Sequence, residues 1–397
     1  MKIFDELKWR GLIQDISSPE LEEKLNNGGM TFYIGTDPTA DSLHIGHYSS
    51  FLITKRLADA GHNPIILVGG ATGLIGDPRG TGERDLADKE IIAKNFEGLK
   101  KQVQKLFPYK VVNNFDWVKD LTVIDFLRDY GKYINVNYML NKDLVRRQME
   151  TGISYAEFSY MLIQGLDFKY LHENMGVDMQ VAGSDQWGNI TTGIELVRKT
   201  TGDEVFAFTM PLITKADGTK FGKSSSGNIW LDKTKTTPYQ MYQFFINSED
   251  SMVIKYLKML TLLSKEEIEE LERLHLEAPE KRDAHKALAR EVITFVHGKE
   301  EYENALKISE ALFTEKINEL SADDIINNFQ DVPTSEIEGE INLVDFLVDN
   351  KICSSKREAR EMVNGNAISI NNRKINDLEF VVNKEIASYT VNLSSGI

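Results

Sequence analysis

Short apolar runs alternate with longer amphipathic segments through the first half of the chain. From Thr31 the order is TFYIGTD, HYSSFLITKRLADAG, NPIILVGG, KEIIAKNFEGLKKQVQKLF and YKVVNN. The short runs have the composition of strands, and the longer segments repeat apolar residues at helical spacing. A second block follows, with a helix predicted over 156–172, a strand over 179–181 and a helix after Gly188. This alternation predicts an α/β fold with a doubly wound, Rossmann-like parallel sheet, whose ligands bind at the carboxyl ends of the strands.

The pattern changes beyond this block. LTVIDFLRDYGKYINVNYML predicts a helical insertion near 115–150 of the α/β domain, which we place at 1–230. Strand signals then disappear, so 231–325 is predicted to be an α-helical domain. Acidic residues dominate 314–340, which favours an acidic linker over 326–340. A basic cluster on a predicted helix, with Lys351 among its members, precedes the β-like AISINNRKI, so 341–397 is predicted to be a small α+β domain.

Charge and cysteine content restrict the possible functions. The net charge of −15 excludes a protein that coats nucleic acid or anionic membrane by bulk charge, so any nucleic-acid contact must be local. The single cysteine, Cys353, can form neither an internal disulfide nor a four-thiolate zinc site. The N-terminal segment lacks the apolar core of a signal peptide, and no apolar run approaches the ~18 residues of a membrane span. We expect a cytoplasmic protein without a membrane partner.

Two histidines one turn apart follow the first predicted strand. His44 and His47 lie in TADSLHIGH at the start of a helix, where the free backbone amides favour a phosphate and Gly46 would let a flat base approach. A chance surface pair and a two-histidine metal site are the alternatives. A metal is disfavoured, because the same helix has no carboxylate at the required spacing.

Turns after two further strands are also candidates. GGATGLIGDP follows the second strand and fits neither the dinucleotide fingerprint nor the P-loop. It is either a glycine-rich structural turn or a place where the backbone closely approaches a ligand, with Asp77 as one of the binding residues. GSDQWGN follows the strand MQVA, where Asp185 is either an ordinary helix cap or a carboxylate that binds a ribose.

Three polar residues, Tyr160, Gln164 and Asp167, are spaced to lie along one face of an otherwise apolar helix. This line is either a solvent face or the wall of a polar ligand site. Apolar residues cover the other faces, which favours the ligand site, because buried polar groups need partners.

A lysine-containing loop completes the candidates. KADGTKFGKSSS resembles a P-loop but is one residue short. Its glycines and serines allow movement, and Lys220 and Lys223 would hold a polyphosphate when the loop closes. The alternative is an ordinary charged loop.

H-I-G-H followed by K-F-G-K-S is the paired signature of class I aminoacyl-tRNA synthetases. YIGTDPTADSLHIGH, GLIGDP, SYAEFSYMLIQGLDF and QVAGSDQWGNIT resemble the bacterial tyrosyl branch of that family, and the resemblance covers essentially the whole chain. It implies an anticodon-binding role for the helical domain. It also implies an RNA-binding fold for INLVDFLVDNKICSSKREAREMVNGNAISINNRKI.

The resemblance assigns four sets of residues. The tyrosine-binding set is Tyr33, Asp77, Tyr160, Gln164, Asp167 and Gln180. The ATP-binding set is Gly35, Asp37, Gly46, Gly183, Asp185, Gln186, Leu212, Ile213 and Lys223. The catalytic set is Thr39, His44, His47, Arg84, Lys220 and Lys223, and the tRNA-binding set is Lys356, Arg357 and Arg360. The chain departs from the family at Thr81, where a lysine is common, and Arg79 lies nearby.

The implied reaction joins tyrosine to tRNA(Tyr) by way of tyrosyl-adenylate, with ATP as substrate, Mg²⁺ accompanying ATP, and no metal site held by the protein. A homodimer is implied, and DNA is not an expected partner. The alternatives are a tryptophanyl relative, a small-molecule adenylyltransferase and a non-catalytic RNA-binding paralogue. The pair of Tyr33 and Asp167 argues against the tryptophanyl relative. The lysine loop argues against the adenylyltransferase, and the intact histidines argue against the non-catalytic paralogue.

Overall fold

A computed structural model of the chain describes residues 1–78, 88–150, 152–224, 227–313, 320–321, 324–325, 328, 339–370, 373–383 and 391–393. Contacts divide the chain into two compact units. The first is Met1–Thr236 with Ile246–Val296, and the second is Thr237–Phe245 with His297–Ile397.

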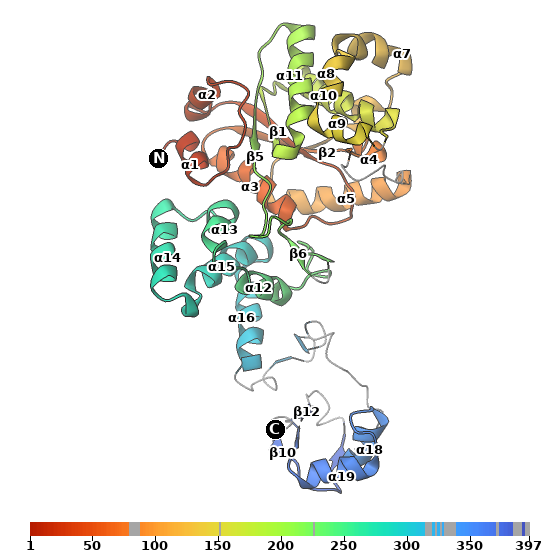
Figure 1. Cartoon of the computed structure of the whole chain (residues 1–397), viewed down its shortest axis with the longest axis vertical. Coiled ribbons are helices and arrows are strands. Elements are labelled where there is room, and N and C mark those ends of the chain that lie inside the picture. The colour runs from red at the N-terminus through yellow and green to blue at the C-terminus, as the bar shows by residue number, and fades with distance from the viewer. Residues whose placement is uncertain are drawn as a thin grey trace. The chain divides into compact units, whose positions relative to one another are not determined.

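A five-stranded parallel sheet forms the centre of the first unit (Figure 1). Its strands are β1 (Thr31–Thr36), β2 (Asn63–Val68), β3 (Lys110–Asn113), β4 (Met179–Gly183) and β5 (Phe206–Met210). Their order is β3-β2-β1-β4-β5, so the chain runs outward to β3 and returns to the far side of β1. This confirms the predicted Rossmann-like fold, and it places the change of direction between the carboxyl ends of β1 and β4.

Helices connect the strands as the periodicity predicts. They are α3 (Ile45–Asp59), α4 (Thr72–Ile75), α5 (Lys89–Leu106), α10 (Tyr155–Met175) and α11 (Trp187–Thr201), after the N-terminal α1 (Ile3–Trp9) and α2 (Leu21–Asn27). The Ser154 side chain caps α10 by accepting the Glu157 N–H at 3.2 Å, and Gly176 ends the helix in a left-handed conformation. The predicted helix over 156–172 is therefore confirmed with slightly wider bounds.

The helical insertion lies between β3 and α10. It consists of α6 (Phe115–Val118), α7 (Val123–Asp125), a π-helical turn (Phe126–Tyr130), a 3₁₀ turn (Gly131–Tyr133), α8 (Val136–Leu140) and α9 (Asp143–Met149). Its own small core packs Ile134, Met139 and Val145 against Met161 of α10 and Leu196 of α11. The insertion is therefore fixed to two helices of the α/β body.

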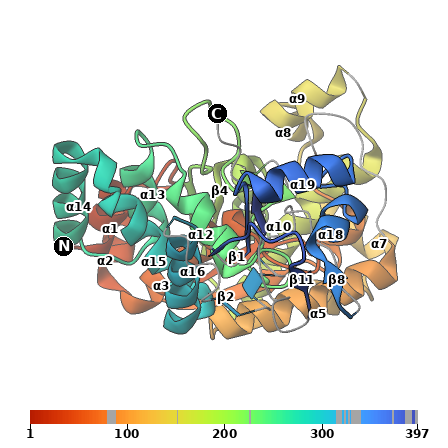
Figure 2. The same ribbon diagram turned by 90° about the horizontal axis from the view of Figure 1, so that it is seen from below.

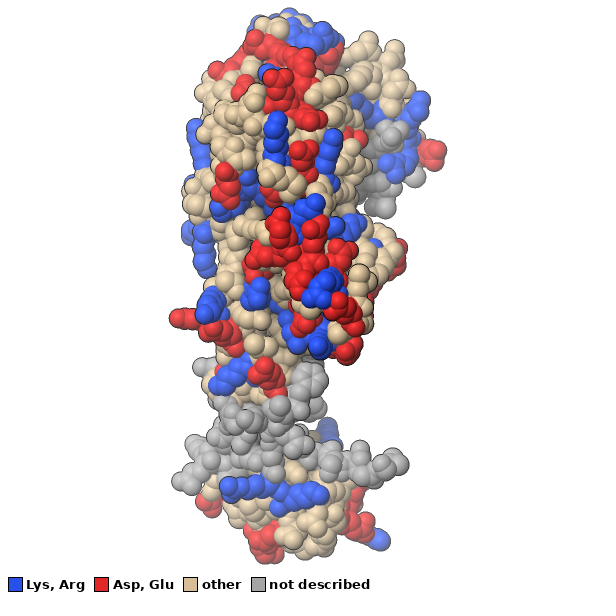
Figure 3. Space-filling view, turned by 90° about the vertical axis from the view of Figure 1, so that its left-hand side faces the viewer, with Lys and Arg blue, Asp and Glu red and all other residues tan. Residues whose placement is uncertain are grey.

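Among the described residues between 231 and 313 the regular elements are helices, as predicted. The α-helices are α12 (Pro238–Ile246), α13 (Val253–Leu260), α14 (Lys265–Glu277), α15 (Asp283–His297) and α16 (Lys299–Phe313). Helix α13 belongs to the first unit and packs against α3. Figure 3 shows a patch of acidic side chains at the position of α14, whose sequence KEEIEELERLHLE is rich in glutamate.

The tail forms a small α+β fold, as predicted. Its elements are β8 (Ile341–Asn342), α18 (Leu343–Asp349), α19 (Lys356–Asn364), β9 (Ile368–Ile370), β10 (Arg373–Lys374), β11 (Val381–Val382) and β12 (Val391–Leu393), and Figure 2 views several of them from below. Leu347, Cys353, Val363 and Ile368 are buried together in its core. Lys351 does not share the helix predicted for the basic cluster: it lies in the turn before α19, with φ 57°.

Across the parts of the chain that the structure describes, no helix is both long and apolar enough to cross a membrane.

Candidate active site

A pocket of about 370 Å³ opens beside the carboxyl ends of β1 and β4. It brings together eighteen of the residues that the sequence predicted for tyrosine, ATP and catalysis. They are Tyr33, Gly35, Asp37, Thr39, His44, Gly46, His47, Asp77, Tyr160, Gln164, Asp167, Gln180, Gly183, Asp185, Gln186, Leu212, Ile213 and Lys220. The face with Tyr160, Gln164 and Asp167 therefore lines a pocket and is not a solvent face.

The buried end of the pocket pairs a phenol with a carboxylate. Tyr33 and Asp167 are each only 1% exposed, and the Tyr33 hydroxyl has no hydrogen-bond partner among the described residues. The Asp167 carboxylate accepts hydrogen bonds from Asn114 Nδ2 at 3.0 Å and from Trp117 Nε1 at 2.8 Å. A buried hydroxyl without a partner beside a buried carboxylate indicates a site for a polar ligand group.

Burial raises the pKa of Asp167 to about 7, although the hydrogen bonds from Asn114 and Trp117 oppose the rise. Burial, and secondly the charge of Asp167, raise the pKa of Tyr33 well above its ordinary value. The Tyr33 phenol therefore keeps its proton and can donate a hydrogen bond to a ligand. Gln180 pairs with Tyr33 in the β1–β4 register, and its buried Oε1 also has no described partner.

A polar network extends along the pocket wall from this end, because Asn114 Nδ2 also donates to Thr72 Oγ1 at 3.0 Å. Tyr160 Oη donates to Asp37 Oδ2 at 2.9 Å, and Thr72 Oγ1 donates to Asp37 Oδ1 at 2.6 Å. Burial and the nearby Asp37 raise the pKa of Tyr160 well above its ordinary value. The Tyr160 hydroxyl therefore stays protonated.

Asp77 belongs to a second network on this wall. It accepts hydrogen bonds from Gln186 Nε2 at 2.8 Å and Asn189 Nδ2 at 3.1 Å, and Asn189 Nδ2 also donates to Gln164 Oε1 at 3.0 Å. Burial raises the pKa of Asp77 to about 6. At neutral pH this wall holds a buried carboxylate that suits a cationic ligand group.

The H-x-G-H turn holds its two imidazoles through the backbone. His44 is the N-cap of α3: its Nδ1 accepts the Gly46 N–H at 3.1 Å, while the Nδ1 of His47 accepts the His44 N–H at 3.2 Å. Burial, and secondly His44, lower the pKa of His47 to about 3. His47 is therefore neutral, and because its Nδ1 accepts, its proton must be on Nε2.

The lysine loop is joined to this turn by backbone hydrogen bonds. Ile229 N donates to Gly222 O at 2.8 Å, and Ile45 N donates to Ile229 O at 2.9 Å. Gly222 has φ +91°, and a Cβ there would overlap the side chain of Ile45. The two signature motifs therefore form one local structure.

Some predicted residues are not described in full. The Lys223 backbone pairs with Asn228 in a short hairpin of β6 (Lys223–Ser224) and β7 (Gly227–Asn228), but the Lys223 side chain is not described. Arg84, and with it Arg79 and Thr81, lies outside the described residues. Their roles stay predictions.

The glycine-rich turn after β2 lies close to protein side chains. A Cβ on Gly69 would overlap Asp37 and Thr72, and Gly70 N donates to Asn113 Oδ1 at 3.1 Å. The first contact supports the pocket wall at Asp37 and Thr72, and the second joins the turn to the end of β3. The backbone at Gly69 and Gly70 therefore lies close to protein side chains, which is what a glycine-rich structural turn predicts.

Sequence reasoning missed four side chains of the networks: Thr72, Asn114, Trp117 and Asn189. Asn114 follows the third strand, and its place near a carboxyl end of the sheet could have indicated it. Asn189 is the last residue of the candidate segment GSDQWGN. No local pattern indicates Trp117.

The predicted tRNA-binding cations lie on α19 of the second unit. Arg357 is largely exposed and pairs with Glu361 at 3.0 Å, while Lys356 pairs with Asp345 at 2.6 Å. Arg360 is also exposed. Two of the three cations therefore have acidic neighbours, and exposed pairs of this kind are weak enough to exchange for phosphate.

The strand order of the parallel sheet reverses beside an H-x-G-H turn, and a lysine loop is joined to that turn. This combination defines the core of a class I aminoacyl-tRNA synthetase. The sequence model for "tRNA synthetases class I (W and Y)" matches residues 25–314, and that for the "Tyrosine--tRNA ligase SYY-like C-terminal domain" matches residues 324–390. The chain belongs to the class I tRNA synthetase family for tryptophan and tyrosine.

The chain is similar to curated tyrosine–tRNA ligases over nearly its full length. It is 50% identical to that of Geobacillus stearothermophilus, covering 97% of this chain and 94% of the relative. It is 49% identical to that of Staphylococcus carnosus, covering 96% and 94%. Among solved structures, a C-terminally truncated mitochondrial tyrosyl-tRNA synthetase of Aspergillus nidulans matches with a TM-score of 0.70 and 32% identity, over 78% of this chain and 94% of that one.

Proposed function

We propose that the pocket binds tyrosine at its buried end and ATP along the H-x-G-H turn, and forms tyrosyl-adenylate between them. The chain acts as a tyrosine–tRNA ligase, an aminoacyl-tRNA synthetase that uses ATP, tyrosine and tRNA(Tyr). The tryptophanyl, adenylyltransferase and non-catalytic alternatives are set aside by this activity.

One observation carries the proposal: the buried end of the pocket offers a donor and an acceptor suited to a phenol. The Tyr33 hydroxyl, which keeps its proton, donates to the substrate hydroxyl, and the Asp167 carboxylate accepts from it. Asn114 and Trp117 hold the carboxylate in place. A phenylalanine side chain would leave the buried Tyr33 hydroxyl without a partner, at a cost of roughly 1–3 kcal/mol, and would deprive Asp167 of the donor that the substrate hydroxyl provides.

The substrate ammonium group binds at the polar wall. Asp77 supplies the negative charge there, and Tyr160 and Gln164 supply oxygen atoms. Gln180 contributes the buried Oε1 that has no described protein partner. The substrate carboxylate then points away from Tyr33 and towards the histidines.

ATP occupies the open part of the pocket. Asp185 holds the ribose hydroxyls, Leu212 and Ile213 contact the adenine, and the remaining ATP residues of the predicted set supply backbone surface and polar contacts. Leu212 is 40% exposed, so part of its apolar surface is open to a flat base. Mg²⁺ arrives with ATP and neutralises phosphate charge.

The chemistry requires positioning and charge stabilisation. A carboxylate oxygen of tyrosine attacks the α-phosphorus in line, and the bond to the bridging oxygen breaks, so that pyrophosphate leaves with its electron pair. His44 and His47 donate from Nε2, since each Nδ1 already accepts a backbone N–H. Thr39, Lys220, Lys223 and Arg84 complete the donors around the redistributing charge.

Transfer to tRNA follows. A hydroxyl of the 3′-terminal adenosine attacks the carbonyl carbon of tyrosyl-adenylate, and AMP leaves. The acidic patch at α14 repels nucleic acid, so we assign tRNA binding to local basic groups, including Lys356, Arg357 and Arg360 of the tail. The helical segment 231–325 serves the anticodon end.

Two further features are proposed. The chain forms a homodimer through the helical insertion, which exposes large apolar side chains that a second copy would cover. They are Val123, Ile124, Leu127, Val136 and Met149; Tyr155, the exposed first residue of α10, follows the insertion in the chain. The single, buried Cys353 supports a working place in the reducing cytoplasm.

ATP–pyrophosphate exchange with the full chain and a panel of amino acids tests the proposed pocket. Exchange should depend on tyrosine and stay near background with phenylalanine or tryptophan. Substituting Tyr33→Phe should weaken tyrosine binding and leave the ATP KM nearly unchanged. A Tyr33→Phe variant that binds tyrosine as tightly as the wild type would overturn the assignment of the buried end.

A further inference from the structure

The lysine loop is attached to helix α13 as well as to the H-x-G-H turn. Tyr256 of α13 is 1% exposed, and its Oη donates to the backbone oxygen of Thr214 at 3.0 Å. Its ring lies against that of Phe221, with centroids 4.1 Å apart. Tyr256 therefore contacts the loop just before and just after the segment that contains Lys220.

The attachment is transmitted to Lys220 through the loop backbone. Thr214 and Lys220 form an antiparallel bridge, and Lys215 N donates to Thr219 O at 2.8 Å. A second link comes from the turn before α13, where Glu249 Oε2 accepts the Ala216 N–H at 3.2 Å. Because Lys220 is the bridge partner of Thr214, fixing Thr214 fixes the backbone of Lys220.

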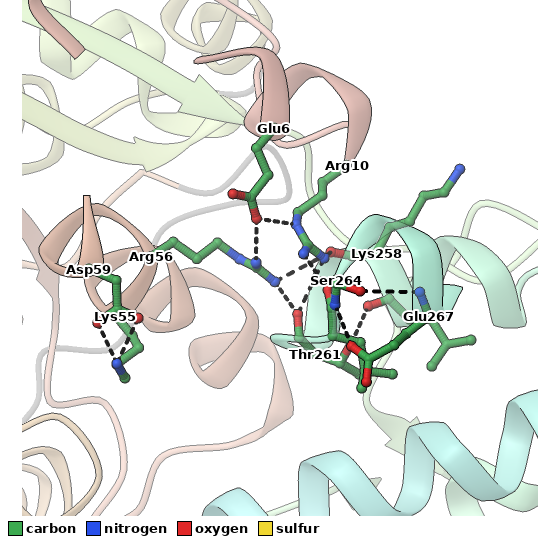
Figure 4. Close-up of polar contacts among 11 residues, drawn as sticks. Glu6, Arg10, Lys55, Arg56, Asp59, Lys258, Thr261, Ser264 and Glu267 are labelled. Atoms are coloured by element: carbon green, nitrogen blue, oxygen red, sulfur yellow. Dashed lines mark hydrogen bonds and ion pairs between the residues drawn. The ribbon is translucent and has the colours of Figure 1, made fainter. Parts of the chain in front are cut away.

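Helix α13 is itself held at its C-terminal end. Arg10 donates to Leu263 O at 2.5 Å, Arg56 donates to Thr261 O, and Glu6 Oε1 accepts from both arginines at 2.7 and 3.2 Å (Figure 4). Both guanidinium groups are almost fully buried. Arg56 thereby binds the carbonyl group of the C-cap residue Thr261, which the end of the helix leaves without an intrahelical partner, and Arg10 holds the chain two residues further on.

This cluster connects the two signature motifs by a second route. Arg56 lies near the end of α3, the helix that begins with the H-x-G-H turn. Helix α13 is thus fixed to α3 by more than one side chain, Arg56 and Tyr48, and to the lysine loop through Tyr256.

We propose that Tyr256 is a positioning residue that sets the backbone position of Lys220 relative to His44 and His47. It does not line the substrate pocket, and it acts only through the loop. The inference rests on the proposed role of Lys220 in adenylate formation. Because burial raises the pKa of Tyr256 to about 12, the hydroxyl remains a donor at working pH.

Substituting Tyr256→Phe removes the hydrogen bond and keeps the ring against Phe221. We expect adenylate formation in the full chain to slow about fivefold, the value for one lost hydrogen bond, with the tyrosine Kd unchanged within about twofold. Tyr256→Ala, which also removes the ring, should slow the step further.

Tyr48→Phe is the matched control. Its hydroxyl donates to Leu260 O at 3.0 Å, so this variant loses an equally buried bond to the end of α13, which Arg10 and Arg56 still hold. It should melt at a temperature similar to that of Tyr256→Phe and form adenylate at the wild-type rate. Equal slowing in both variants would mean a general structural effect and would overturn the inference.

A double variant separates this inference from the proposed function. If Tyr256 acts through Lys220, adding Tyr256→Phe to Lys220→Ala should slow the step by less than about twofold. Full multiplication of the two effects would overturn the positioning role. If Lys220→Ala alone leaves the rate unchanged, the proposed function of the loop fails instead.

Discussion

The imidazole rings of His44 and His47 lie stacked at the start of α3, with centroids 3.8 Å apart and planes 21° apart. Each ring accepts a backbone N–H at Nδ1, and the two bonds form a reciprocal cap of the helix. The backbone therefore fixes the tautomer as well as the position of both rings. A positive charge on His47 would be unfavourable in this stack, because burial, and secondly His44, lower the pKa of His47 to about 3.

Replacing His47→Asn should reduce the pH dependence of stability. The pKa of His47 is about 3 in the folded protein and near 6.5 in the unfolded chain, so the unfolded chain binds the extra proton between these values. The contribution of His47 to the free energy of unfolding is therefore fully present above pH 6.5. It is lost as the pH falls towards 3, by up to about 1.4 kcal/mol per pH unit.

Urea unfolding between pH 7.5 and 4.5 measures the difference. The raised pKa values of Asp77 and Asp167 act in the opposite direction, and they act in wild type and variant alike. The difference between the two proteins therefore isolates His47. Parallel curves for wild type and variant would show that His47 titrates normally.

Lys220→Ala and Lys223→Ala should each slow adenylate formation about 100-fold and leave the tyrosine Kd nearly unchanged, because their contacts form mainly in the transition state. Stopped-flow kinetics and equilibrium binding separate the two quantities. Lys215→Ala, in the same loop but outside the pocket lining, is the control and should retain the wild-type rate. Equal losses in affinity and rate would contradict the assignment.

Asp167→Ala should reduce the preference for tyrosine over phenylalanine by roughly 10- to 100-fold, since the substrate hydroxyl loses its acceptor. Exchange assays with both amino acids give the ratio of kcat/KM. Asp116→Ala, a carboxylate outside this pocket, should leave the ratio unchanged. Undiminished selectivity in Asp167→Ala would place the phenol site elsewhere.

Removing residues 341–397 should leave tyrosine activation nearly intact, because every residue with an assigned part in activation, Tyr256 included, precedes residue 341. Transfer to tRNA should fall sharply. Reversing the charge of Arg357 and Arg360 should reproduce part of this loss and flatten the salt dependence of tRNA binding, since fewer counterions are released. A truncated protein that charges tRNA at the full rate would refute RNA binding by the tail.

Tyr155→Asp and Ile124→Lys should shift the protein from dimer to monomer, because each puts a charge among the exposed apolar residues of the insertion and of the start of α10. Light scattering after size exclusion gives the mass. Leu276→Lys is the matched control, since Leu276 is 77% exposed on α14 and should not affect assembly. A wild-type chain that is monomeric at micromolar concentration would contradict the homodimer.

The sequence by itself determined the architecture and the chemical types at the site. Short apolar runs that alternate with helical periods predict the parallel sheet, because each strand is covered by helices on both faces of the sheet. This pattern does not depend on which particular residues the strands and helices contact. Spacing places Tyr160, Gln164 and Asp167 on one face of α10, since helix geometry is local. The two signature motifs and their order indicated the family before any contact was known.

Only the tertiary structure decided which side chains complete each network. Asp167 is held by Asn114 and Trp117, and Lys220 is positioned through Tyr256; in each case the partners are far apart in the chain. Periodicity specifies which face of an element is buried, but it does not specify what that face meets. Those partners depend on how the strands are ordered and where each helix crosses the sheet, which only the packing of the whole unit determines.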